Sequence, residues 1–178
     1  MMPLGTTAPD FTLLEVTSGN MVSLQELRSE KATVIMFVCN HCPYVKHINQ
    51  KLVEVAEKYM KRGASFIAIS SNDVEKYPED GPEKKKETAA EEGYPFPYLF
   101  DESQQVAKAY DAACTPDFYI FDKNLGCAYR GQFDGSRPKS DVPVTGQDLT
   151  AALEEIMAGK AVSAPQKPGI GCNIKWKA

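Results

Sequence analysis

Residues 33–43 read TVIMFVCNHCP and place two cysteines directly after an apolar run. The first six of these residues are mostly apolar and β-branched over the length of one strand, which is typical of a strand buried on both faces of a sheet. From Pro43 to Tyr59 apolar residues recur at spacings of three and four, which predicts an amphipathic helix. We therefore expect a central strand, a tight turn carrying Cys39 and Cys42, and a helix.

The segments that follow predict an α/β protein. Residues 65–70 (SFIAIS) form a second buried-type strand, so strand, helix and strand succeed one another as in a right-handed parallel crossover. Residues 117–122 and 125–130 predict an antiparallel hairpin, and residues 145–158 predict the last helix. With an edge strand at residues 11–16, the pattern predicts three layers, with helices flanking a central mixed sheet.

Three further segments connect these elements. Residues 81–92 carry mixed charges at helical spacing, so we interpret the lysine run at 84–86 as the solvated face of an exposed helix. Residues 94–97 contain two prolines and are predicted to be an extended linker. Residues 103–110 predict a short helix with Ser103 near its N-cap.

The length of 178 residues and the hydrophobic fraction of 43% favour a single domain spanning residues 1–178. We expect its core to occupy about residues 5–158. Residues 159–178 are rich in proline and glycine and would stay ordered only if they docked as a tail. The apolar residues available for docking are Ile170, Ile174 and Trp176.

Charge and hydropathy exclude several classes of function. The net charge of −4 arises from intermixed acidic and basic residues, without the basic face that would follow a phosphate backbone, so we expect no nucleic-acid partner. No apolar run approaches the roughly 20 residues of a membrane-spanning helix, and the first residues do not resemble a signal peptide. We therefore expect a soluble, cytoplasmic monomer or homodimer.

The cysteine pair carries the chemistry. Five cysteines, an odd number, do not resemble the disulfide framework of a secreted scaffold. Cys39 and Cys42 lie where a strand meets the start of a helix, where the macrodipole and free N–H groups stabilise a thiolate. We expect Cys39, at the exposed mouth of the turn, to attack, and Cys42 to act as the resolving thiol. His41 would support the Cys39 thiolate.

A metal site is the alternative use of the same pair. Cys-x-x-Cys supplies half of many zinc sites, but this chain has no second pair. Its two histidines, His41 and His47, both lie near the pair, so Cys39, Cys42 and one histidine could form a metal-binding or carrier site. The leading interpretation, disulfide exchange, needs neither a metal nor an organic cofactor.

The order strand, Cys-x-x-Cys, helix, and later Cys114-Thr115-Pro116 before a strand, resembles the thioredoxin superfamily. The resemblance implies that Pro116 is a cis-proline facing the cysteine pair, and that the backbone of Thr115 binds an extended substrate segment. Asn40 and Pro43 are then the neighbouring substrate-binding candidates. The implied partners are protein or small-molecule thiols and disulfides, with a thioredoxin-type reductant as a further candidate.

The segment GTTAPDFTL at residues 5–13 resembles the start of the peroxiredoxin and redoxin branch, the AhpC/TSA type. More narrowly, the CNHCPYV motif, residues 131–138 and the IGCNIKWK tail resemble a peroxiredoxin-like thioredoxin family. This resemblance implies a second candidate activity, that of an antioxidant thiol peroxidase.

The sequence departs from the peroxiredoxin pattern at the residues that activate peroxide. Counting back from Cys42, Cys39 and Ile35 stand where peroxiredoxins carry Thr or Ser and Pro, and Pro116 replaces an Arg. Without those hydrogen-bond donors a thiol reacts slowly with peroxide, so we expect at most weak peroxidase activity. The arginines that could substitute are Arg130 and Arg137.

The other cysteines have a simple alternative interpretation, because free cysteine often packs as a small apolar residue. We interpret Cys127 in this way, and also Cys114, although it lies two residues before Pro116. Cys172 is different, because a docked tail would bring it toward residues 39–42. It is therefore a candidate third redox thiol.

Overall fold

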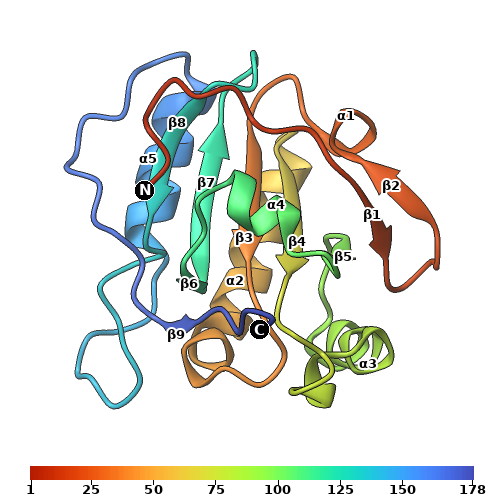
Figure 1. Ribbon diagram of the computed structural model, residues 1–178. Coiled ribbons are helices and arrows are strands. Elements are labelled where there is room, and N and C mark those ends of the chain that lie inside the picture. The colour runs from red at the N-terminus through yellow and green to blue at the C-terminus, as the bar shows by residue number, and fades with distance from the viewer.

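The computed structural model describes all residues from 1 to 178 and contains nine strands, five α-helices and one 3-10 helix (Figure 1). In chain order the elements are β1 (Thr12–Glu15), β2 (Met21–Ser23), α1 (Leu24–Leu27), β3 (Thr33–Phe37), α2 (Pro43–Lys61), β4 (Ser65–Ser70), η1 (Pro78–Asp80), α3 (Pro82–Glu92), β5 (Tyr98–Phe100), α4 (Gln105–Ala109), β6 (Cys114–Thr115), β7 (Asp117–Phe121), β8 (Cys127–Gly131), α5 (Gln147–Met157) and β9 (Cys172–Asn173).

The main sheet is mixed, with strand order β2-β1-β5-β4-β3-β7-β8. β3 lies in the interior of the sheet, parallel to β4 and antiparallel to β7, and all five of its residues are buried. The helix α2 connects β3 to the parallel strand β4, and β7 and β8 form the antiparallel hairpin. The predicted α/β class and the interior place of this strand are confirmed.

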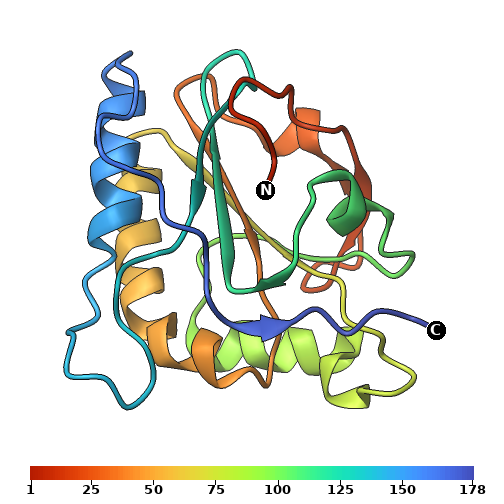
Figure 2. The ribbon, with the colours of Figure 1, turned by 60° about the vertical axis from the view of Figure 1, so that its left-hand side comes forward.

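Helices cover both faces of the sheet (Figure 2). On β3, Val34 and Met36 belong to the apolar core that includes residues of α2 and α5, whereas Ile35 and Phe37 belong to the core under α1 and α4. Alternate side chains therefore hold β3 between two cores, and the turn that follows it starts from a fixed position. None of the helices is both long enough and apolar enough to cross a membrane.

Several short elements differ from the sequence-based expectation. The strand predicted at residues 11–16 is β1, but it is not an edge strand, because it pairs with β2 on one side and β5 on the other. β5 was not predicted, because its three residues follow a proline-rich linker and are too few to show a period. The N-cap of α4 is Gln104, so Ser103 lies next to the N-cap as expected, and its hydroxyl accepts a hydrogen bond from the N–H of Gln105.

The interpretation of the lysine run as a solvated face is wrong for one residue. Lys84 and Lys86 are exposed on α3, but Lys85 is 0% exposed. Its ammonium lies 4.5 Å from the centre of the Phe100 ring and donates to the backbone carbonyl of Asp80. Burial lowers the pKa of Lys85 to about 8, against the opposing effect of the Asp80 charge.

We predict that Lys85→Met removes an alkaline rise in the free energy of unfolding. Folded Lys85 has a pKa of about 8 and an unfolded lysine keeps its ordinary 10.5, so the unfolded state binds more protons between these pH values. Stability therefore rises with pH across this window, by about 3 kcal/mol. Urea denaturation across the same pH window measures the difference between wild type and variant.

Lys86→Met, on the exposed side of the same helix, is the matched control and should keep the wild-type pH dependence. Parallel pH profiles for wild type and Lys85→Met would contradict the assignment of a buried, titrating ammonium.

Candidate active site

The turn from β3 into α2 carries the cysteine pair. Cys42 is the N-cap of α2 and Pro43 occupies its first turn, so the second sulfur sits at the positive end of a 19-residue helix. Cys39 is 1% exposed and Cys42 is 0% exposed. The expectation that Cys39 lies at an exposed mouth is therefore wrong, because Thr115 packs against Cys39 and Cys172 packs against Cys42.

The loop before β7 faces the two cysteines. The Thr115–Pro116 peptide bond is cis, as the thioredoxin resemblance implied. Cys39 Sγ lies 3.5 Å from the Thr115 hydroxyl oxygen, and Cys42 Sγ lies 3.4 Å from the Thr115 carbonyl oxygen. The fold thus brings Thr115 to Cys39 and Cys42, although 76 and 73 residues separate it from them in the sequence.

A third sulfur completes the cluster. β9 pairs antiparallel with β6, with Thr115 opposite Cys172 and Cys114 opposite Asn173 (Figures 1 and 2). Cys172 Sγ lies 2.7 Å from Cys42 Sγ. Ile174 is buried at 3% exposure, whereas Ile170 and Trp176 are 54% and 40% exposed, so only one of the three predicted apolar contacts holds this segment.

The environments of the two paired sulfurs differ. A hydrogen bond from the Cys39 thiol lowers the pKa of Cys42 well below its ordinary value, against the effect of burial, and Cys172 and the N–H of Val45 add to this. Donating that hydrogen bond, together with burial, raises the pKa of Cys39. These shifts favour Cys42 rather than Cys39 as the thiolate, the reverse of the expected assignment.

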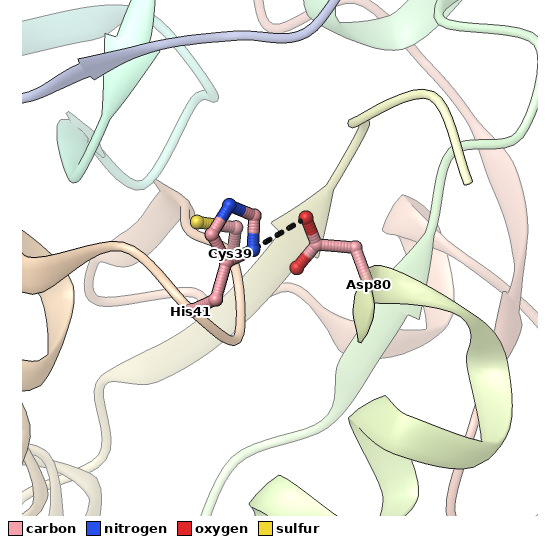
Figure 3. A group of neighbouring side chains, drawn as sticks. All are labelled: Cys39, His41 and Asp80. Carbon is pink, nitrogen blue, oxygen red and sulfur yellow. Dashed lines mark ion pairs between the residues drawn. The ribbon is translucent and has the colours of Figure 1, made fainter. Parts of the chain in front are cut away.

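His41 projects from the same turn toward an aspartate of η1 (Figure 3). Its Nδ1 lies 2.9 Å from Asp80 Oδ2, and its ring stacks on Tyr77 with the centroids 6.1 Å apart. Potential ligand atoms of Cys39, His41 and Asp80 all lie within 4.8 Å of one another. Asp80 thus orients the imidazole beside Cys39.

Asp80 was not predicted as a site residue. It is 0% exposed, its Oδ1 accepts the N–H of Asn40 at 2.9 Å, and its Oδ2 accepts the Asn72 amide at 2.9 Å. One signal pointed to it: Asn72 and Asp80 follow β4 in the chain, and the carboxyl ends of the parallel strands β3 and β4 meet at one edge of the sheet.

The potential metal ligands that lie together differ from the expected set of Cys39, Cys42 and one histidine. The structure groups Cys39 and His41 with Asp80, and not with Cys42. His47 points elsewhere, with its Nε2 2.6 Å from the Ser136 hydroxyl. Both Asp80 oxygens already have donors, so this buried carboxylate is satisfied without a cation.

Neither candidate arginine hydrogen-bonds to the cysteines. The Arg130 guanidinium donates to the Met2 carbonyl and to Gln166. Arg137 donates to the Gln132 side chain and to backbone carbonyls within its own loop. The peroxiredoxin-type arginine contact is therefore not reproduced by either residue.

The remaining candidate residues are Asn40, Pro43, Cys114 and Cys127. Asn40 donates to the Glu79 carbonyl at 2.8 Å and accepts from the Tyr98 hydroxyl at 2.8 Å, so its side chain fixes the turn, while Pro43 is exposed. Burial raises the pKa of Cys127 to about 11 and that of Cys114 to about 12, which leaves both protonated at neutral pH.

Comparison with known proteins agrees with this geometry. The thiol-disulfide oxidoreductase YkuV of Bacillus subtilis is 28% identical over 126 residues, covering 68% of this chain and 80% of YkuV. An uncharacterized conserved protein from Geobacillus kaustophilus superposes with a TM-score of 0.97 at 60% identity, covering 99% of this chain and 94% of that one.

The fold itself is shared more widely. The thioredoxin domain of a thiol-disulfide oxidoreductase from Bacteroides vulgatus superposes with a TM-score of 0.62 at 17% identity, covering 73% of this chain and 89% of that one. The mixed sheet flanked by helices is therefore thioredoxin-like. A family model described as AhpC/TSA matches residues 4–129. The chain belongs to the AhpC/TSA family, within the thioredoxin superfamily.

Proposed function

We propose that this protein is a thiol-disulfide oxidoreductase whose redox centre is the pair Cys39 and Cys42. The observation that carries the proposal is the position of Cys42 at the N-terminus of α2, with its pKa lowered and Cys39 as hydrogen-bond donor. A thiolate held beside a second thiol is what disulfide exchange requires. The name of the relative YkuV, a thiol-disulfide oxidoreductase, supports the same activity.

The reaction can be written from these two sulfurs. The Cys42 thiolate attacks one sulfur of a substrate disulfide, the substrate S–S bond breaks, and the other substrate sulfur leaves as a thiolate that takes up a proton. Cys39 then loses its proton and attacks Cys42 Sγ, which releases the bound substrate sulfur. The products are a Cys39–Cys42 disulfide and two substrate thiols, so two electrons pass from protein to substrate; the reverse sequence oxidises a dithiol.

His41 is the proposed proton acceptor for the second step. The pKa of Cys39 is raised, so this thiol needs a base when it becomes the nucleophile. The imidazole lies beside Cys39, and Asp80 holds it in place through Nδ1.

A thiol peroxidase is the second candidate, and one observation favours it. The chain belongs to the AhpC/TSA family, and Cys42 has the lowered pKa that a peroxide-reactive thiol needs. Ile35, Cys39 and the distant arginines do not supply the donors that polarise peroxide, so disulfide exchange is the stronger proposal. Rapid peroxide consumption that exceeds disulfide turnover would reverse this order.

We predict that the thiolate at neutral pH belongs to Cys42. Folding lowers the pKa of Cys42 well below its ordinary value of 9.0. The sulfur therefore stays deprotonated at neutral pH and takes up a proton only in acid. Ultraviolet thiolate absorbance should therefore persist at neutral pH in the wild type and disappear in Cys42→Ser. The control Cys127→Ser should keep the absorbance. Absorbance that persists in Cys42→Ser and disappears in Cys127→Ser would contradict the assignment of the thiolate to Cys42.

Turnover tests the proposed activity directly. With a dithiol as electron donor and insulin as the protein disulfide, Cys42→Ser should lose activity by about 100-fold or more, because no thiolate remains to attack. Cys127→Ser, which removes a buried thiol in the other apolar core, should match the wild type. Wild-type rates in Cys42→Ser, or no turnover in the wild type itself, would reject the proposal.

A further inference from the structure

The segment around Cys172 is fitted closely against the loop before β7. A Cβ atom on Gly171 would lie 1.9 Å from the Thr115 carbonyl oxygen, and one on Gly169 would lie 3.1 Å from the Pro116 carbonyl oxygen. Only glycine permits the first approach without displacement of the backbone. The sequence Gly-Ile-Gly-Cys is therefore matched to the pairing of β9 with β6.

A second set of contacts anchors the segment beyond Cys172. Ile174 donates its N–H to the Ala113 carbonyl at 3.1 Å and buries its side chain. Lys175 donates its N–H to Asn72 Oδ1 at 2.8 Å, and its carbonyl accepts the N–H of Asp73 at 2.8 Å. Contacts on both sides of Cys172 thus fix the position of its sulfur.

This arrangement places the protein's own strand where an extended substrate would pair with Thr115. The 2.7 Å between Cys42 Sγ and Cys172 Sγ is about 0.7 Å longer than a disulfide bond. Cys39 and Cys42 are buried, whereas Cys172 is partly exposed. Of these three sulfurs, Cys172 is the one that external thiols can reach without undocking the segment.

We propose that Cys172 is a relay thiol that forms a disulfide with Cys42 and carries exchange between the buried pair and external low-molecular-weight or protein thiols. The proposal rests on the proposed function and adds a third catalytic sulfur to it. It also assigns β9 as a built-in substrate strand.

The relay conserves atoms and electrons at each step. An external thiolate attacks Cys172 Sγ of the Cys42–Cys172 disulfide, that bond breaks, and Cys42 leaves as a thiolate. A second external thiolate then attacks the external sulfur of the mixed disulfide. This step yields an external disulfide and releases Cys172, which takes up a proton. Two electrons have passed from the external thiols to the protein.

A separate exchange connects the relay to the buried pair. Cys39, after losing its proton, attacks Cys42 Sγ in the Cys42–Cys172 disulfide and releases Cys172, leaving a Cys39–Cys42 disulfide with no net oxidation. The lowered pKa of Cys42 suits the first relay step, in which the external thiolate attacks Cys172 and Cys42 is the leaving group.

The first test maps disulfides in Cys39→Ser, which leaves Cys42 without its neighbour in the pair. After oxidation of the full chain with glutathione disulfide, alkylation and peptide mass spectrometry should find Cys42 bonded to Cys172. Cys42 recovered as a glutathione adduct or bonded to Cys114 would overturn the proposal.

The second test measures turnover in Cys172→Ser with a small dithiol and a small disulfide. Turnover should fall about tenfold or more while iodoacetamide labels Cys42 as slowly as in the wild type, because the pair stays covered without its relay. The control Cys127→Ser should turn over normally. Wild-type turnover in Cys172→Ser would overturn the relay and leave the proposed function standing, whereas an inactive wild type would remove both.

The third test moves the strand and keeps every thiol. Gly171→Ala forces β9 away from Thr115, so iodoacetamide should reach Cys42 about tenfold faster and the yield of Cys42–Cys172 disulfide should fall. Gly135→Ala is the matched control, because a Cβ there meets no atom within 4 Å. Unchanged labelling and unchanged disulfide yield in Gly171→Ala would contradict the role of β9.

Discussion

The backbone pairing of Thr115 with Cys172 is the interaction on which the arrangement of the site depends. Thr115 contacts Cys39 through its hydroxyl and Cys42 through its carbonyl, and its partner strand brings Cys172 to Cys42. These contacts join three parts of the chain: the turn at residues 39–42, Thr115 and Cys172. A strand pair only two residues long thus fixes three sulfurs, because flanking contacts on both sides hold β9 in register.

The same pairing changes the chemistry of the cysteines. Covering the turn removes Cys39 and Cys42 from water, which disfavours a thiolate, yet the helix start and the hydrogen bonds from neighbouring thiols favour one at Cys42. The pKa is lowered at Cys42 and not at Cys39, because Cys42 accepts those hydrogen bonds while Cys39 donates one. Burial therefore separates the two thiols into a charged sulfur and a protonated one.

Sequence patterns predicted the parts of this site that are local. The apolar run at residues 33–38, the cysteine spacing and the helical period after Pro43 defined the strand, the turn and α2. The motif at Thr115 and Pro116 added the facing loop through a family resemblance. The strand, the turn and the helix are readable because each depends on neighbours in the sequence.

What the sequence could not predict depends on contacts between distant segments. Lys85 reads as one of three similar lysines, and only the packing of α3 on β5 shows that it is buried. The burial of the cysteine turn likewise depends on contacts with Thr115 and Cys172, which no local pattern around Cys39 indicates. The expectation that Cys39 is exposed is wrong for this reason, because the local sequence does not show which distant segments pack over the turn.

Buried charge is the remaining constraint, and it connects α3 to the site. An uncompensated buried carboxylate costs several kcal/mol, so Asp80 at 0% exposure needs partners. It has the amide of Asn72 and the imidazole of His41, and the Lys85 ammonium lies against its backbone carbonyl. These partners meet at η1, so contacts with Asp80 connect the helix α3 to the turn after β3. The position of His41 beside Cys39 therefore depends on the fold around Lys85 as much as on the Cys-x-x-Cys motif.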